Sequence, residues 1–64
     1  MNYQINDTGE ADFNYTKKGF KGHFNGYGKI IDIDARYVLF ADNDDFEYLV
    51  KKKDFTFRAC EVLK

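Results

Sequence analysis

The chain has 64 residues, 44% of them hydrophobic, with seven Phe, five Tyr and a net charge of -1. This length predicts one domain over residues 1–64, and the aromatic content excludes an intrinsically disordered chain. The near-neutral charge argues against a general nucleic-acid coat protein, and no apolar run approaches the roughly 18 residues of a membrane-spanning helix.

The first third of the chain predicts strands. Residues 1–8 alternate weakly and indicate a short edge strand or a frayed terminus. Residues 10–16 place Ala11, Phe13 and Tyr15 on one face, which is the pattern of a half-buried strand. The sequence Lys-Lys-Gly at residues 17–19 ends this pattern.

The next segment predicts a β-hairpin with its turn at Asn25-Gly26, because both residues tolerate the positive φ of a type I′ turn. Its strands would cover residues 20–24 and 28–34. Gly22 and Gly28 within these strands indicate bulges or sharp bends.

Residues 37–41 are apolar on both faces and predict a central strand that is covered on both sides, followed by a turn at residues 42–45. Residues 46–50 alternate as a strand. A short helix over residues 45–53 is the alternative, since Asp44 and Glu47 match a capping box and three lysines follow. Residues 55–63 predict the last strand.

Five or six short strands in so short a chain are expected to close into a small, strongly bent barrel. The stretches GKIIDID, YVLFAD, FEYLV and KDF, within residues 26–62, resemble the last four elements of an SH3-like or Tudor-like barrel. The resemblance implies an all-β fold of five or six strands with one short helical or 3₁₀ turn at residues 53–55, where Phe55 plugs the barrel end. A Tudor-like barrel would bind methylated lysine or arginine in an aromatic cage, and no cage is assigned in this chain. The expected core comprises Ile31, Ile33, Val38, Phe40, Tyr48, Val50 and Phe57.

Catalytic chemistry is not expected from the residue types present. The glycines match no phosphate-binding loop, and His23 and Cys60 are single copies, expected as a surface residue and a small hydrophobe. The acidic run at residues 42–45 lacks the glycine and glutamate of a calcium-binding loop. We therefore expect no enzymatic activity, no cofactor and no metal site.

Charge is strongly segregated along the chain. Residues 17–29 carry four lysines and no acid, residues 30–50 carry six acids and one arginine, and residues 51–64 carry five cations and two acids. In an SH3-like barrel the first and last strands are neighbours, so the two basic blocks would form one face. The candidate partner-binding residues are Lys17, Lys18, Lys21, Tyr27, Lys51, Lys52 and Lys53. The tyrosines expected to be partly exposed are Tyr3, Tyr15, Tyr27 and Tyr37.

These features favour a non-enzymatic module that binds and modulates, for instance inhibits, a larger protein. A nucleic-acid-binding barrel that uses the basic patches and tyrosines is the alternative, and a structural or oligomer-forming subunit is a third hypothesis. Residues with A/T-rich codons are abundant, which indicates a phage or mobile-element accessory protein acting on a host protein. A single cysteine and the lack of a secretory signal in residues 1–13 favour the reducing cytoplasm, and no membrane partner is expected.

Overall fold

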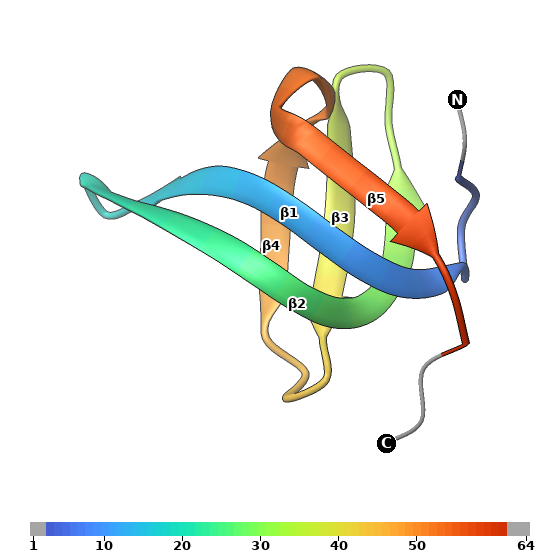
Figure 1. Ribbon diagram of the computed structural model, residues 1–64. Helices are drawn as coiled ribbons and strands as arrows, with labels where there is room; N and C mark the ends of the chain where they lie inside the picture. The colour runs from blue at the N-terminus through green and yellow to red at the C-terminus, as the bar shows by residue number, and fades with distance from the viewer. Residues whose placement is uncertain (1–2, 62–64) are drawn as a thin grey trace.

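The computed structural model describes residues 3–61 and is all-β, as the sequence predicts. Five antiparallel strands form one sheet in the order β4-β3-β2-β1-β5 (Figure 1). The elements are β1 (Thr8–Lys17), β2 (Phe20–Ile33), β3 (Tyr37–Asp42), β4 (Glu47–Lys51), the 3₁₀ turn η1 (Lys52–Asp54) and β5 (Phe55–Ala59). Residues 46–50 therefore belong mainly to a strand, and the alternative helix over residues 45–53 is wrong apart from η1.

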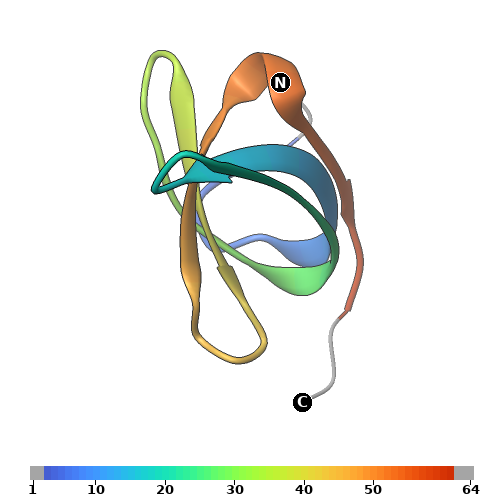
Figure 2. The ribbon, with the colours of Figure 1, turned by 90° about the vertical axis from the view of Figure 1, so that its left-hand side faces the viewer.

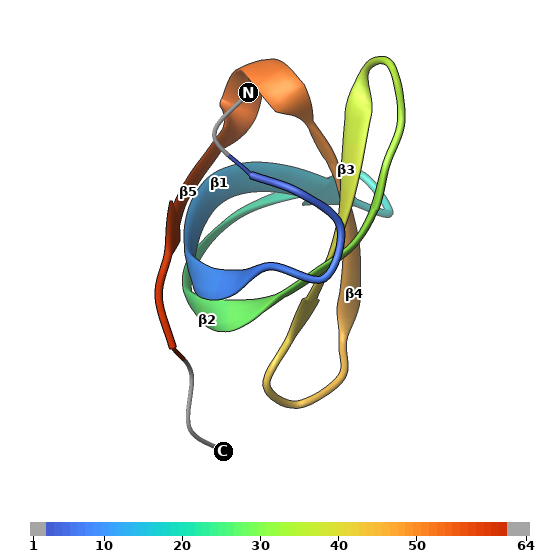
Figure 3. The ribbon, with the colours of Figure 1, turned by 90° about the vertical axis from the view of Figure 1, so that its right-hand side faces the viewer.

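The sheet curls around its own interior. Figures 2 and 3 show the β1–β2 hairpin crossing between β5 on one side and the β3–β4 pair on the other. β1 and β4 are not hydrogen-bonded neighbours, yet the ring of Tyr48 lies 5.4 Å from that of Phe13 and 5.3 Å from that of Tyr15. This curvature brings distant strands together around one aromatic interior.

The hairpin turn lies at Lys18-Gly19, so the predicted turn at Asn25-Gly26 is wrong. Lys18 and Gly19 have φ values of 52° and 83°, and Lys17 pairs directly with Phe20. Residues 20–33 form one continuous strand instead of two. Tertiary packing decides this register, because it sets Phe24 opposite Phe13 with their rings stacked at 5.1 Å.

Two features determine how β2 packs against β3. A Cβ at Gly28 would collide with the backbone oxygen of Ala41, so only glycine lets β3 approach this closely. A register shift lies between Ile30 and Asp32, where the extra residue reverses the alternation. As a result Ile30 is fully buried and Ile31 is 37% exposed, so the prediction that Ile31 belongs to the core is wrong.

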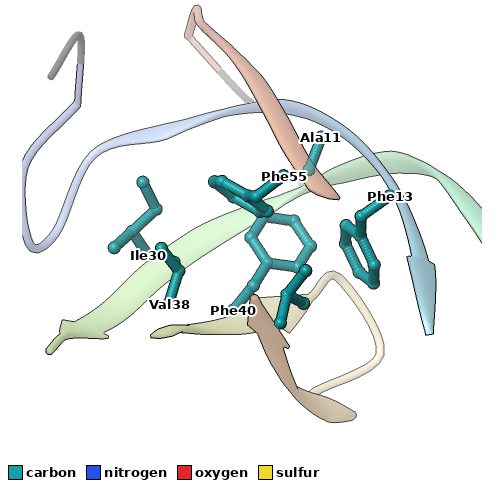
Figure 4. Close-up of a cluster of buried hydrophobic side chains, with 7 residues drawn as sticks. Ala11, Phe13, Ile30, Val38, Phe40 and Phe55 are labelled. Carbon is teal, nitrogen blue, oxygen red and sulfur yellow. The ribbon is translucent and has the colours of Figure 1, made fainter. Parts of the chain in front are cut away.

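The core is a cluster of apolar side chains from all five strands (Figure 4). Of the predicted core, Val38, Phe40 and Val50 are buried, and Ile33, Tyr48 and Phe57 are half-buried against the cluster. Phe55 is buried, and the 3₁₀ turn expected at residues 53–55 is present one residue earlier, so Phe55 is the first residue of β5. The remaining members of the buried cluster are Ala11, Phe13 and Ile30.

The strand β3 lies inside the sheet between β4 and β2, so it is not an edge strand, but its outward face is only half-buried and not covered as predicted. The turn that follows is organised by one carboxylate. Asp42 Oδ1 accepts hydrogen bonds from the backbone N–H groups of Asp44 (2.9 Å) and Phe46 (3.0 Å), and Asp42 Oδ2 accepts one from the Tyr48 hydroxyl (3.3 Å). These bonds explain why the acidic segment 42–45 forms a turn, as predicted.

The ends of the sheet differ from expectation. Of the two alternatives for residues 1–8, the short edge strand is wrong for residues 3–7, although Asn6 N–H bonds to Ile30 O (2.8 Å) and Ile30 N–H bonds to Asp7 O (2.9 Å). Residues 1–2 lie outside the described residues. The last strand ends at Ala59, while residues 62–63 of the predicted strand lie outside the described residues. Cys60 follows β5 and is exposed, so its expected place as a small hydrophobe within a strand is wrong.

Candidate functional site

An open groove lies between the β1–β2 hairpin and the edge strand β4. The hairpin projects beyond β4 (Figure 1), and the space between them has a volume of about 760 Å³. We call it the hairpin groove. Its lining residues are Asn14, Tyr15, Thr16, Lys21, Gly22, His23, Tyr37, Leu49, Val50, Lys51 and Asp54.

The apolar part of the hairpin groove comes from three strands. Tyr15 on β1 and Tyr37 on β3 are half-buried, and Leu49 on β4 is 65% exposed. Gly22 pairs with Tyr15, and a Cβ at Gly22 would meet the Tyr15 ring. The glycine therefore leaves room for the tyrosine ring, which forms part of the groove wall.

The charged part of the hairpin groove is mainly basic. Lys21 from β2 and Lys51 from β4 are both exposed and lie on different walls. Asp54 of η1 is the acidic residue that lines the groove. The two basic blocks of the sequence thus meet at this groove, each through one lysine.

The outer face of the hairpin carries a polar cluster around His23. Nδ1 of His23 lies 2.7 Å from Asn14 Oδ1, and its Nε2 lies 3.0 Å from Asp12 Oδ1. Asn25 donates a hydrogen bond to Asp12 Oδ2 at 3.2 Å. His23 is exposed, as predicted, but it lies within a strand, and its contacts tie β1 to β2.

None of the other predicted site residues lines the groove. Lys17 and Lys18 are at the tip of the hairpin, next to Phe20, which is 79% exposed. Lys52 and Lys53 belong to η1, which follows Lys51 directly. Tyr27 is exposed on β2, pairs with Glu10 and does not line the groove.

Sequence reasoning missed several residues of the hairpin groove. Leu49 was not proposed as a site residue. It lies between Tyr48 and Val50, and its side chain points to the face of the strand opposite to theirs, toward solvent. Tyr15 and Tyr37 are partly exposed, as predicted, but only the curved sheet brings them to the same groove. Single exposed apolar residues are common on protein surfaces, so the sequence alone gives no signal that would single out Leu49.

A smaller hollow of about 390 Å³ lies at the other end of the β2–β3 pair and is lined by Ile31, Lys29 and Asp42 among others. Within residues 3–61, no three His, Cys, Asp or Glu side chains gather closely enough to hold a metal ion. No helix among the described residues has the length and hydropathy needed to cross a membrane.

Comparisons with protein-family models, with curated proteins and with solved structures gave no match. The similarity to SH3-like and Tudor-like domains therefore stays a prediction from the sequence pattern. The hairpin groove is identified by its own geometry, exposure and charge.

Proposed function

We propose that this protein is a non-enzymatic protein-binding module whose hairpin groove takes an extended, acidic segment of a larger protein and thereby modulates that protein. The observation that carries the proposal is the convergence of Lys21 and Lys51 on an open groove with exposed Leu49. A host protein bound by a phage or mobile-element accessory protein fits the composition of the chain. The exposed free thiol of Cys60 favours the reducing cytoplasm as the place of action.

Charge supports an acidic partner. Lysines on the two walls attract a carboxylate-bearing segment from either side, and such rim charges act mainly on the rate of encounter. The acidic turn at residues 42–45 lies at the start of β4, and η1 with its lysines follows the end of β4. An acidic partner is therefore directed to the Lys51 end of the strand.

Apolar surface supports an anchored peptide over a purely electrostatic contact. Exposed Leu49, together with the rings of Tyr15 and Tyr37, offers contact area in a concave site. Tyrosine is enriched in protein interfaces because it combines a large ring with a polar tip. A segment that alternates acidic and apolar residues matches both features.

The test uses a fluorescent peptide that alternates Glu and Leu, with a Lys-Leu peptide of the same length as its control. We expect the acidic peptide alone to bind, and the double change Lys21→Glu and Lys51→Glu to weaken binding by about tenfold or more. Lys29→Glu, an exposed lysine of β2 outside the groove, is the matched control variant. Equal binding of both peptides, or equal loss in the control variant, would contradict the proposal.

Nucleic-acid binding is the second candidate, favoured by the lysines at the hairpin tip beside exposed Phe20. Labelled single- and double-stranded oligonucleotides, titrated at about 50 mM and 200 mM salt, separate the two functions. Micromolar binding that disappears at the higher salt, and a salt slope that falls by up to about three in the Lys51, Lys52 and Lys53→Ala variant, would favour nucleic acid. No binding at the lower salt leaves the protein partner as the proposed ligand.

A further inference from the structure

We infer that the free protein self-associates through β4, whose exposed edge pairs with β4 of a second copy in an antiparallel, two-fold symmetric arrangement. The inference goes beyond the proposed function and does not rest on it. It starts from the position of β4, which is the last strand on one side of the sheet. An edge strand presents unpaired backbone donors and acceptors that another strand can bind.

The hydrogen-bond pattern shows which backbone groups of β4 point outward. Asp42 N–H bonds to Phe46 O (3.0 Å), and Lys52 N–H bonds to Arg36 O (2.9 Å). Hydrogen-bonded pairs alternate along an antiparallel ladder, so between these two positions Tyr48 and Val50 direct their backbone groups toward β3. Glu47, Leu49 and Lys51 direct theirs to the free edge.

These three outward positions define one favoured register. With Leu49 on the two-fold axis, Leu49 pairs with Leu49 of the second copy, and Glu47 pairs with Lys51 of the second copy. Each of the three residue pairs across the interface then forms two backbone N–H···O bonds, which gives about six hydrogen bonds in all. A two-fold axis at Tyr48 or Val50 leaves one of the three positions without a partner inside β4.

The side chains of β4 are self-complementary in this register. Glu47 and Lys51 are exposed, and Leu49 is 65% exposed on the same outward face. Two-fold pairing sets each Glu47 opposite a Lys51 and joins the two exposed leucines between the ion pairs. Opposite charges directly across a strand pair are favourable, and like charges are unfavourable. An isologous contact of this kind closes after two copies.

The hairpin groove adds a further charge match. It borders the Leu49–Lys51 half of β4, so it faces the Glu47 end of the second copy in the antiparallel pair. Lys21 in the groove of one copy therefore lies on the same side as Glu47 of the second copy, and their opposite charges attract. The pairing also occupies the groove, so self-association and the binding of an acidic segment exclude each other.

Sedimentation velocity of the full chain from about 1 µM to 1 mM tests the inference, because so short an interface predicts weak association. We expect a reversible monomer–dimer equilibrium. Glu47→Lys places Lys opposite Lys at both ends of the interface, and Lys51→Glu places Glu opposite Glu. Each change is expected to weaken dimerisation by about tenfold or more.

Mixing the two variants gives a specific readout. A Glu47→Lys chain is complementary to a Lys51→Glu chain, so the mixture is expected to form a heterodimer although each variant alone stays monomeric. The double variant with both changes regains the homodimer. Lys53→Glu and Glu61→Lys are exposed control changes outside β4 and should leave the dimer intact.

Three results would overturn the inference. They are a monomer at about 1 mM, a dimer that both single variants leave unchanged, and a mixture that does not form the heterodimer. Circular dichroism confirms that each variant keeps its β structure. Acidic-peptide binding by a monomeric variant with an intact groove wall, Glu47→Lys, tests the proposed function separately.

Discussion

The aromatic interior and the hairpin groove share the strand β4 and differ in almost every physical property. On the inner side, Val50 is buried among rings such as Phe13 and Phe40, which lie 5.7 Å apart. On the outer side, Leu49 is mostly exposed between charged residues. A period of two thus directs the Val50 side chain into the interior and leaves the Leu49 side chain exposed. Substitutions in the two regions should therefore have separable effects.

The largest expected difference between the two regions comes from removing a side chain of the aromatic interior, which should lower the free energy of unfolding. Phe40→Ala removes a fully buried ring and is expected to lower the free energy of unfolding by about 3–5 kcal/mol. A loss of that size approaches the whole stability of a small domain. Thermal and urea unfolding followed by circular dichroism measure it.

Leu49→Ala is the matched change on the outer face of β4 and should alter stability by no more than about 0.5 kcal/mol. An unchanged melting temperature for Phe40→Ala, or an equal loss in both variants, would show that the assignment of inner and outer faces is wrong.

The acidic turn gives the next largest effect. Asp42→Ala leaves two backbone N–H groups and the Tyr48 hydroxyl without their acceptor and should cost about 1–2 kcal/mol. Asp44→Ala removes an exposed carboxylate from the same turn and serves as the control. Urea unfolding compares the two, and a smaller loss in Asp42→Ala than in Asp44→Ala would contradict the role of Asp42.

The hairpin turn is tested by Gly19→Ala, which forces an L-residue to a φ of 83° and should cost about 1–2 kcal/mol. Asn25→Ala lies within β2 and should cost less, since no turn is needed there. Thermal unfolding ranks the two variants. The reverse ranking would place the turn at Asn25-Gly26 and remove the projecting wall of the groove.

The smallest effect is a loss of stability at alkaline pH. Burial, followed by the charge and hydrogen bond of Asp42, raises the pKa of Tyr48, and burial raises the pKa of Tyr3. A folded-state pKa above the unfolded value of about 10 means that the stabilisation is complete below pH 10 and is lost as pH rises through the folded pKa. Melting temperatures between pH 8 and 11 should fall less steeply in Tyr48→Phe, whereas the exposed Tyr27→Phe should follow the unmodified protein.

The sequence was sufficient for much of the fold. Alternation predicted strands at residues 10–16 and 46–50, a run that is apolar on both faces predicted the strand at residues 37–41, and a 3₁₀ turn was expected at residues 53–55, one residue later than η1. The groove was harder to predict. Lys21 and Lys51 were candidates because of local charge, but Leu49 was missed because a single exposed leucine gives no signal without its surroundings.

What the sequence determined by itself was local: strand alternation, the Asx-rich turn at Asp42 and the all-β class. These depend on side-chain period and on hydrogen bonds between residues a few positions apart. The tertiary structure decided the rest. With Phe24 stacked on Phe13, the hairpin turn lies at Lys18-Gly19 and not at the predicted Asn25-Gly26. Because of the bulge after Ile30, the buried residue is Ile30 and not the predicted Ile31. Both outcomes depend on which strand packs opposite, and that information lies far along the chain from the residues it controls.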